Sequence, residues 1–469
     1  MYRRLGIGLA GLTAVVASSL FASVGCSEDN PQASAPPPIV IGVSFGLTND
    51  LGTFSAPLRD AGRAAEGEIN ANGGILGRPV RYDIVDDRSD EGAGVSAVVQ
   101  RFADENVAAV IGPISSGQVK ATAGILAAKQ IISISPSATS VELSTLQPDS
   151  DRFLFRTTPA DDFQGAAVVR FASLTPRGIG LDAGTPAGDG GAATATACSK
   201  MGLVYIDNSY GVSMAENIKK SFPTVVAGGT IFEKKLPLAA ASSYATEVGQ
   251  VLGGMPDIEC LALIAYTTAG VQFVRDFISD SRYAAAQSRG FFFIGTDGIY
   301  TEGFVSGNAL NDVADPSKGA VTNGAFGTNP DTQPGSQEYN AFKTIFSSYF
   351  PLAAGADAPA FASNAYDAAV LAALAIERAG SATDRIRIRD ALREVSSGPG
   401  RPIGPADIGT ALTTIRGGED IDYKGASGSV DFQANGNVLG GFIIWQVVPD
   451  PAKGFAFRTV ARFSQDELQ

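Results

Sequence analysis

Short apolar runs alternate with helical stretches along most of this chain, and this alternation restricts the possible folds more than any other feature. The runs are rich in Val and Ile and end in glycine or polar residues, which is typical of strands buried in a parallel sheet. The helical stretches supply the crossovers that parallel strands need. The first part predicts strands at 39–45, 80–85, 107–111 and 131–135, with helices at 57–70, 92–103 and 119–129.

A second series with the same alternation begins after residue 160 and predicts a second lobe of similar design. The predicted fold class is therefore α/β, with two doubly wound lobes. Residues 428–431 and 442–448 are expected to form a β-hairpin around the turn signal Asn435-Gly436. The other expected strands are 202–206, 229–235, 261–266 and 291–295, and the expected helices are 163–172, 214–222, 246–252, 271–279, 338–346, 366–379 and 387–395.

Two strands of the first lobe end in small hydroxyl residues. Ser115 and Ser116 follow the third strand, and Ser137 and Thr139 follow the fourth. In an open α/β sheet, ligands bind beyond the carboxyl ends of the strands, so these residues could present hydroxyl and N–H groups to a small polar ligand. Each of them alone fits a helix cap or a turn better, but two matching endings favour a binding site.

Composition removes several classes of function. The chain has 469 residues, no histidine and a net charge of −13. Without histidine there can be no His-dependent triad, general base or metal site, and the sequence predicts neither a metal nor a cofactor. The negative charge, with no long run of Lys or Arg, argues against nucleic-acid binding.

The N-terminal segment has the pattern of a secretory signal, because Arg3 and Arg4 precede a long apolar stretch. An uncleaved membrane anchor is the alternative for a stretch of this length. Ser23-Val-Gly-Cys26 resembles a bacterial lipobox, whose cysteine becomes the lipidated N-terminus, but Ser23 departs from that motif and ordinary cleavage before Cys26 stays open. We expect a signal peptide at 1–25, then a lipidated Cys26 and a flexible tether at 26–38.

The two remaining cysteines form an even pair if Cys26 carries lipid, which suits an oxidising compartment. In a doubly wound sheet of order 2-1-3-4-5, the first and third strands are neighbours. Cys198 lies just before the first strand of the second lobe, and Cys260 just before the third. A disulfide between them is therefore expected, beside a Gly-rich insertion at 175–196. Two separate buried thiols are the alternative.

Three motifs resemble functional signatures without meeting their requirements. Gly6-Ile-Gly-Leu-Ala-Gly11 matches a dinucleotide fingerprint but lies in the signal segment. Gly42-Val-Ser44-Phe-Gly46 matches the nucleophile elbow of α/β-hydrolases, whose chemistry needs a histidine partner. Asp86-Asp87-Arg88-Ser89-Asp90 lacks the ligand alternation of a Ca²⁺ loop, and Asp90 is expected to cap the next helix.

Several segments together carry a family resemblance, which spans roughly residues 39 to 448. In their order and spacing they resemble type I periplasmic binding proteins, in particular the leucine/isoleucine/valine-binding receptors of ABC transporters. The segments are Ile39-Val-Ile-Gly-Val-Ser-Phe-Gly, Glu68-Ile-Asn-Ala-Asn-Gly-Gly-Ile-Leu-Gly-Arg78, Val85-Asp-Asp87, Ile111-Gly-Pro-Ile-Ser-Ser116, Ser135-Pro-Ser-Ala-Thr139, Phe155-Arg-Thr-Thr158, Ser209-Tyr-Gly211, Gly295-Thr-Asp-Gly298 and Ala365-Tyr-Asp-Ala368.

The resemblance implies two Rossmann-like lobes joined by three crossovers, with a hinge and a ligand cleft that closes on binding. One lobe would comprise 39–158 and 299–427, the other 159–298 and 428–455, with a C-terminal tail at 456–469. Matched by position, Ser116, Ser137 and Thr139 correspond to the family's contacts with an amino acid α-carboxylate. Asp297 corresponds to the acidic partner of the α-ammonium, and Tyr210 and Tyr266 to tyrosines that face the cleft.

The leading functional hypothesis is a non-enzymatic receptor in the periplasm, lipid-anchored to a membrane. It would capture a small amino acid, of the branched-chain type or a related amide, and deliver it to an ABC permease in the inner membrane. A ligand-sensing subunit of the same fold with a signalling partner is the alternative. A carboxylate-dependent hydrolase is the third hypothesis, disfavoured by the missing histidine and by the lack of an acid pair at catalytic spacing.

Overall fold

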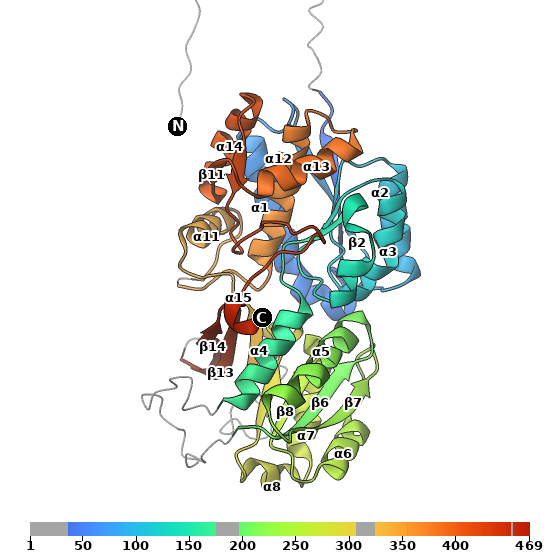
Figure 1. Cartoon of the computed structure of the whole chain (residues 1–469), viewed down its shortest axis with the longest axis vertical. Helices are drawn as coiled ribbons and strands as arrows, with labels where there is room; N and C mark the ends of the chain where they lie inside the picture. Colours follow the sequence, from blue (N-terminus) through green and yellow to red (C-terminus); the bar gives the residue numbers. More distant parts are fainter. Residues whose placement is uncertain (1–35, 175–196, 306–323, 354, 452–453) are drawn as a thin grey trace, which may run out of the picture. The chain divides into compact units, whose positions relative to one another are not determined.

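Two β-sheets with their crossover helices organise the chain (Figure 1). The computed structural model describes residues 36–174, 197–305, 324–353, 355–451 and 454–469, and from Pro37 on the chain belongs to one compact unit. The expected signal peptide, Cys26 and the insertion at 175–196 lie outside the described residues. No helix among the described residues is long and apolar enough to cross a membrane.

The sheet of the first lobe has five parallel strands in the order β2-β1-β3-β4-β5. This is the predicted doubly wound order, with the first and third strands as neighbours. All residues of β1 except Val40 are buried, as expected for a strand covered on both faces. The elements are β1 (Ile39–Phe45), α1 (Gly52–Ala71), β2 (Val80–Asp86), α2 (Ala93–Asp104), β3 (Val110–Ile111), α3 (Ser116–Ala128), β4 (Ser133–Ser135) and β5 (Leu154–Arg156).

The sheet of the second lobe repeats that order and extends it. Its strands run β7-β6-β8-β9-β10, all parallel, and β13 and β14 then add two antiparallel strands. The elements are α4 (Asp161–Ser173), β6 (Lys200–Ile206), α5 (Ser209–Val225), β7 (Thr230–Leu236), α6 (Ala245–Gly254), β8 (Cys260–Ile264), α7 (Thr267–Ser279), α8 (Tyr283–Gln287), β9 (Phe292–Gly295), α9 (Glu302–Val305), β10 (Phe326–Pro330), β13 (Phe442–Asp450), β14 (Gly454–Phe463) and α15 (Gln465–Leu468).

The predicted hairpin between 428–431 and 442–448 is wrong. β13 pairs with β10 on one side and β14 on the other, and Val430 is instead buried in the core of the first lobe. The turn at Asn435-Gly436 does form, with Gly436 at a φ of 75°. Its carbonyl accepts the N–H of Arg156 at 3.0 Å, so this turn closes the end of β5 and joins no paired strands.

The predicted C-terminal tail at 456–469 is also wrong, because most of β14 and all of α15 lie there. The ring of Trp445 on β13 lies against Gly327 of β10, where a Cβ atom would come within 2.0 Å of it. Its indole N–H donates to the carbonyl of Thr328 at 3.2 Å, and Phe457 of β14 packs edge-on against it at 4.9 Å. These contacts attach the end of the chain to the second lobe.

The predicted assignment of 299–330 to the first lobe is wrong for its described residues. Ile299, Val305 and Phe326 are buried in the core of the second lobe, and β10 belongs to its sheet. The chain returns to the first lobe only after Pro330. Within the described ranges, the chain therefore crosses between the two cores three times: between β5 and α4, after β10, and between Val438 and β13.

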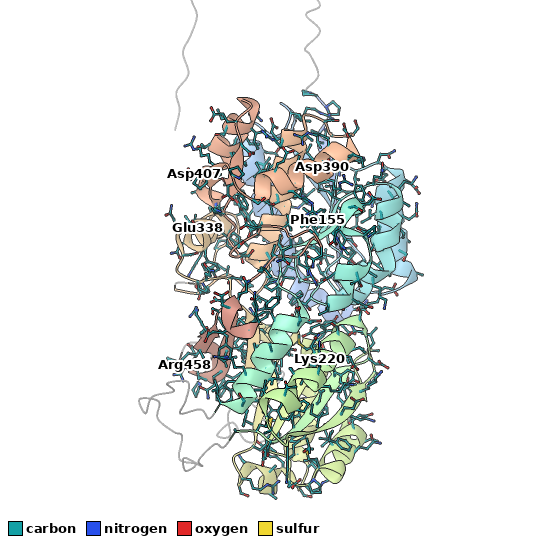
Figure 2. The ribbon with its side chains drawn as sticks, viewed as in Figure 1. Phe155, Lys220, Glu338, Asp390, Asp407 and Arg458 are labelled. Carbon is teal, nitrogen blue, oxygen red and sulfur yellow. A yellow bond between two sulfur atoms is a disulfide. The ribbon has the colours of Figure 1, made fainter. Side chains whose placement is uncertain are left out.

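Both lobes expose charged side chains and bury apolar ones (Figure 2). Asp390 and Asp407 are exposed on the first lobe, and Lys220 and Arg458 on the second, whereas Phe155 is buried. The core of the first lobe is centred on α12, nearly all of whose residues are buried. Further elements of this lobe are α11 (Gln337–Tyr349), α12 (Ala362–Ala379), α13 (Arg385–Ser396), β11 (Arg401–Ile403), α14 (Ile408–Arg416) and β12 (Ile421–Tyr423).

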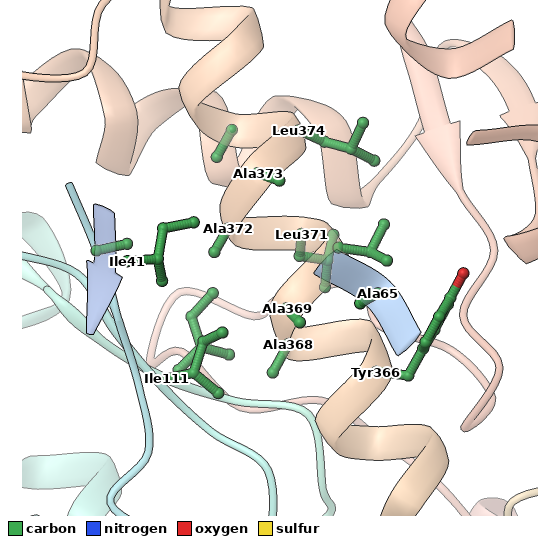
Figure 3. Close-up of a cluster of buried hydrophobic side chains, with 14 of the residues drawn as sticks. Ile41, Ala65, Ile111, Tyr366, Ala368, Ala369, Leu371, Ala372, Ala373 and Leu374 are labelled. Atoms are coloured by element: carbon green, nitrogen blue, oxygen red, sulfur yellow. The ribbon is translucent and has the colours of Figure 1, made fainter. Parts of the chain in front are cut away.

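Small side chains let α12 approach both a helix and the sheet. Ala65 of α1 lies beside α12, and Ile41 and Ile111 point toward it from the sheet (Figure 3). Alanine carries little side-chain volume, so neighbouring elements pack closely around this helix. The Ala-rich pattern of 362–379 therefore explains how a helix can be buried on all sides.

The predicted disulfide is present in the second lobe. Cys198 and Cys260 are bonded, with Cα atoms 5.8 Å apart. β6 and β8 are neighbours as the strand order requires, and Met201 is opposite Cys260 in their register. The bridge lies at the start of both strands, and the residues of the candidate pocket follow their opposite ends.

Candidate ligand-binding pocket

A small pocket, with a cavity volume of about 20 Å³, lies between the two lobes. The first lobe contributes the predicted residues Ser116 and Ser137, together with Ser115. The second contributes Tyr210, Tyr266 and Asp297. Leu51, Phe54, Ile114 and Gly298 complete the lining. The structure therefore brings together five of the six predicted ligand residues, and Thr139 lies directly behind the pocket wall.

The start of α3 forms the polar wall of the first lobe. Ser115 caps this helix, since its Oγ accepts the N–H of Gln118 at 3.2 Å, which confirms the cap interpretation for this residue. Ser116 Oγ accepts the N–H groups of Thr139 at 3.2 Å and of Ser140 at 3.1 Å. With both acceptor positions used, the hydroxyl proton of Ser116 is available to donate. Together with the first N–H groups of α3, it makes a site suited to an anion. The Glu91 carboxylate, which accepts the hydroxyl of Ser115, lies beside the same helix start.

Ser137 and Thr139 occupy different positions in the adjoining loop. Ser137 Oγ donates to the carbonyl of Ile114 at 2.8 Å, so it can offer only acceptor capacity to a ligand. Thr139 Oγ1 is buried and makes no hydrogen bond among the described residues. Arg156 supports this loop from behind by donating to the carbonyls of Ala138 and Ser140. Burial lowers the pKa of Arg156 to about 10, so the guanidinium stays charged at neutral pH.

Three groups of the second lobe form one connected arrangement. Tyr210 donates from its hydroxyl to Asp297 Oδ1 at 2.7 Å. Tyr266 stacks on Tyr210 with ring centroids 5.9 Å apart and planes 8° apart. Burial raises the pKa of Asp297 to about 6, because hydrogen bonds from Tyr210 and its neighbours offset only part of the lost hydration.

A second buried carboxylate, Asp161, was missed by sequence reasoning. It begins α4, is fully buried, and burial together with the charge of Asp297 raises its pKa to about 8. The hydroxyls of Thr139 and Ser213 lie close enough to lower that pKa, but neither carboxylate oxygen has a hydrogen bond of normal geometry among the described residues. In the sequence, Asp161 has the pattern of an ordinary first-turn acid, and only its burial distinguishes it.

Glu91 and Asn208 were also missed, and they connect the lobes. Asn208 caps α5 through the N–H of Gly211 at 2.9 Å. Its amide donates to Glu91 Oε1 at 3.1 Å and to the Tyr266 hydroxyl at 3.2 Å. Both residues follow the ends of predicted strands, which is the same criterion that selected the serines. That criterion would also have selected Glu91 and Asn208.

The motifs set aside in the sequence have structural partners. Ser44 Oγ donates to Asp87 at 2.8 Å, and Asp90 accepts the N–H groups of Gly92 and Gly94 at 2.8 and 2.7 Å. Asp90 thus accepts two N–H groups at the start of α2, but the N-cap position of that helix is Gly92, not Asp90 as predicted. Within the described ranges, no group of three or more Cys, Asp or Glu side chains is arranged to hold a metal ion.

Two doubly wound lobes joined by three crossovers, with a polar pocket between them, define the class of periplasmic solute-binding proteins. The chain belongs to the periplasmic binding protein family, which residues 38–415 match. The resemblance and the fold class predicted from the sequence are therefore confirmed. Members of this class are solute receptors that work outside the cytoplasm.

Among curated proteins, the chain is similar to BasB of Halobacterium salinarum, a substrate-binding protein of a chemotactic signal transduction system. The two are 26% identical over 425 residues, which is 87% of each chain. Among solved structures it resembles LivJ of Streptococcus pneumoniae in complex with isoleucine, with a TM-score of 0.64, 20% identity, and coverage of 91% of this chain and 99% of LivJ. A solute-binding protein of Rhodopseudomonas palustris in complex with 4-hydroxybenzoate has a TM-score of 0.66, 16% identity, and coverage of 92% and 98%.

Proposed function

We propose that this protein is a non-enzymatic receptor that binds a small amino acid in the pocket between its lobes. One observation carries the proposal: Asp297, a buried carboxyl group with no ion pair among the described residues, lines the pocket together with Ser116 at the start of α3. A second buried carboxyl group, Asp161, lies next to Thr139. A buried carboxylate is stable as an anion only when a cation or hydrogen bonds compensate it. The α-ammonium of an amino acid supplies that cation, and its α-carboxylate fits the anion site at the start of α3.

The roles within the pocket follow from this orientation. Asp297 takes the ammonium directly, with Tyr210 holding its carboxylate in place. Asp161, next to Thr139, holds its proton at neutral pH and becomes negatively charged only when the bound ammonium lowers its pKa. Ser116 and the first N–H groups of α3 take the carboxylate. Ser137 and Thr139 remain proposed contacts of the same end of the ligand.

The side-chain end of the ligand should be small and apolar. Leu51, Phe54 and Ile114 line the pocket beside the polar groups. These residues offer no charge or hydrogen bond to a polar side chain, so an aliphatic side chain of the branched-chain type fits them best. A related amide is the alternative within this class.

Aromatic acids are the competing ligand class, because the similar R. palustris protein holds 4-hydroxybenzoate. A benzoate fits the anion site but lacks an ammonium group. It would leave Asp161 and Asp297 without an ammonium partner beside a third carboxylate, which like-charge repulsion opposes. The charge of the second lobe therefore favours an amino acid.

A calorimetric and thermal-shift screen tests this assignment directly. We expect one or a few of the twenty amino acids to raise the melting temperature and to bind with measurable heat, and 4-hydroxybenzoate to do neither. The proposal fails if no amino acid binds, and it is replaced by the aromatic-acid class if the benzoate binds in their place.

Transport and sensing remain two uses of the same binding event. Delivery to an ABC permease in the inner membrane is the first proposal, and a signalling partner is the second, favoured by the similarity to BasB over 87% of both chains. Loss of radiolabelled amino acid uptake on deletion of the gene supports transport. Loss of chemotaxis toward that amino acid with intact uptake supports sensing.

We also propose that the protein works in the periplasm, anchored to a membrane by lipid on Cys26 after removal of residues 1–25. Mass spectrometry of the mature N-terminus tests this. An acylated Cys26 supports the anchor, and an unmodified N-terminus at Cys26 supports ordinary cleavage.

A further inference from the structure

Glu91 bridges the beginnings of two helices that belong to different lobes. Its Oε1 accepts the hydroxyl of Ser115, the cap of α3, at 2.8 Å. The same oxygen accepts the amide of Asn208, the cap of α5, at 3.1 Å. A carboxylate near a helix N-terminus is stabilised by the partial positive charge there. Glu91 gains this stabilisation from both helices, and it keeps both only while the lobes are closed.

Backbone geometry makes room for this carboxylate on α3. Gly117 is the second residue of the helix, and a Cβ atom there would come within 2.0 Å of Glu91 Oε2. Any side chain at this position would displace the carboxylate from the helix start. The missing side chain of Gly117 is therefore part of the Glu91 site.

The contacts of Glu91 lead into the ligand pocket from both sides. Ser115 precedes Ser116 and itself lines the pocket. Asn208 donates to the hydroxyl of Tyr266, which stacks on Tyr210, and Tyr210 in turn donates to Asp297. Tyr266 also packs against the apolar cores of both lobes.

We propose that Glu91 is a positioning residue that couples lobe closure to the shape of the pocket, by holding the α3 cap of one lobe and the Asn208–Tyr266 pair of the other. Two further contacts join α5 to the first lobe through residues that do not line the pocket. Ser213 Oγ accepts the N–H of Val141 at 2.9 Å, and Ser209 donates to Glu142, which also pairs with Lys120. Those contacts can hold the lobes together, whereas Glu91 also orients groups that line the site.

The first test measures closure without any ligand. In a Cys26→Ser chain carrying Ser209→Cys and Glu142→Cys, dibromobimane bridges the two new thiols when the lobes are closed and becomes fluorescent. We expect Glu91→Gln and Gly117→Ala each to slow the bridging about fivefold, the effect of losing one charge-assisted hydrogen bond. Glu105→Gln, an exposed carboxylate paired with Arg101 in the same lobe, should leave the rate unchanged. Equal rates in all four chains would overturn the proposal.

Gly117→Ala separates positioning from a general loss of stability. Alanine is the better helix former, so this variant should not lower the melting temperature of the empty protein. It should still weaken binding as much as Glu91→Gln does, about tenfold and through faster dissociation, and the two changes together should weaken it no further. Additive effects, or a lower melting temperature accompanied by unchanged dissociation, would contradict the proposal.

The ligand readout rests on the proposed function, but the cross-linking readout does not. If no amino acid binds the wild-type chain while Glu91→Gln slows bridging, the coupling stands and the amino acid assignment fails. If an amino acid binds and the bridging rates are equal, the assignment stands and the coupling fails.

Discussion

In the first lobe the pocket is lined by hydroxyls that already have hydrogen-bond partners, whereas the second lobe contributes two buried carboxyl groups that form no direct ion pair among the described residues. Ser115, Ser116 and Ser137 each have a hydrogen-bond partner within the protein. Asp161 and Asp297 are buried, and burial raises both pKa values. The hydroxyls of the first lobe are thus already held in place by hydrogen bonds. The carboxyl groups of the second lobe gain an ammonium partner only when the ligand binds.

This difference assigns separate tasks to the two lobes. A preorganised anion site lowers the ordering cost of binding but recognises any small anion. Uncompensated carboxylates destabilise the empty protein, and they reject ligands that bring no cation. Specificity for a zwitterion should therefore depend on the second lobe more than on the first.

Asp297→Asn should have the largest effect on binding. Removing one partner of a buried, hydrogen-bonded charge pair costs about 2–5 kcal/mol, so we expect an amino acid to bind at least about 30-fold more weakly. Titration calorimetry measures the change. Asp162→Asn is the matched control, because Asp162 is exposed on α4 next to Asp161. A loss of less than about threefold would show that the ammonium is held elsewhere.

Asp161→Asn should weaken binding by about tenfold and stabilise the empty protein above neutral pH. The folded pKa of Asp161, about 8, lies above its ordinary value of 3.8. As the pH rises from about 4 to about 8, the unfolded chain releases this proton before the folded chain does, so the free energy of unfolding falls. The variant removes that loss, and its melting temperature at pH 8 should exceed that of the wild type by about 2 °C or more. Equal melting curves at pH 5 and pH 8 in the wild type would contradict this account.

Proton release on binding tests the same charge without a mutation. An ammonium placed beside Asp161 and Asp297 should lower both pKa values, so at pH 7 binding should release a proton from carboxyls that held it in the empty site. Calorimetry in two buffers of different ionisation enthalpy measures the number, which we expect to lie between about 0.5 and 1. No dependence on the buffer would mean that the ligand brings no cation to these groups.

The sequence predicts several of the polar residues that meet in the pocket, but it does not predict the second buried carboxyl group beside it. Strand ends locate Ser116, Ser137 and Asp297, because the carboxyl ends of parallel strands meet at one edge of a sheet. Sequence reasoning misses Asp161, because an acidic residue in the first turn of a helix is usually exposed and its burial cannot be inferred from the sequence. Glu91 follows a strand end as the serines do, but its contact with Asn208, which lies 117 positions away in the other lobe, cannot be inferred from the local sequence.

The errors at the end of the chain have a related cause. β14 is an edge strand that carries Arg458 and Arg462, and its assignment depends on pairing with β13. The Asn435-Gly436 signal predicts a local turn correctly but says nothing about which strands pair around it. Pairing between distant segments is set by packing, here by Trp445 on Gly327.

The smallest predicted effect distinguishes two serines of the first lobe. The Ser116 hydroxyl accepts two backbone N–H groups and keeps its own proton for the ligand, whereas Ser137 gives its proton to the carbonyl of Ile114. Ser116→Ala should therefore weaken amino acid binding about tenfold, and Ser137→Ala about twofold, because only the first removes a donor to the carboxylate. Both variants should leave proton release unchanged, since neither touches Asp161 or Asp297. Equal losses would place the carboxylate between the two serines, and a larger loss for Ser137→Ala would reverse the ligand's orientation in the anion site.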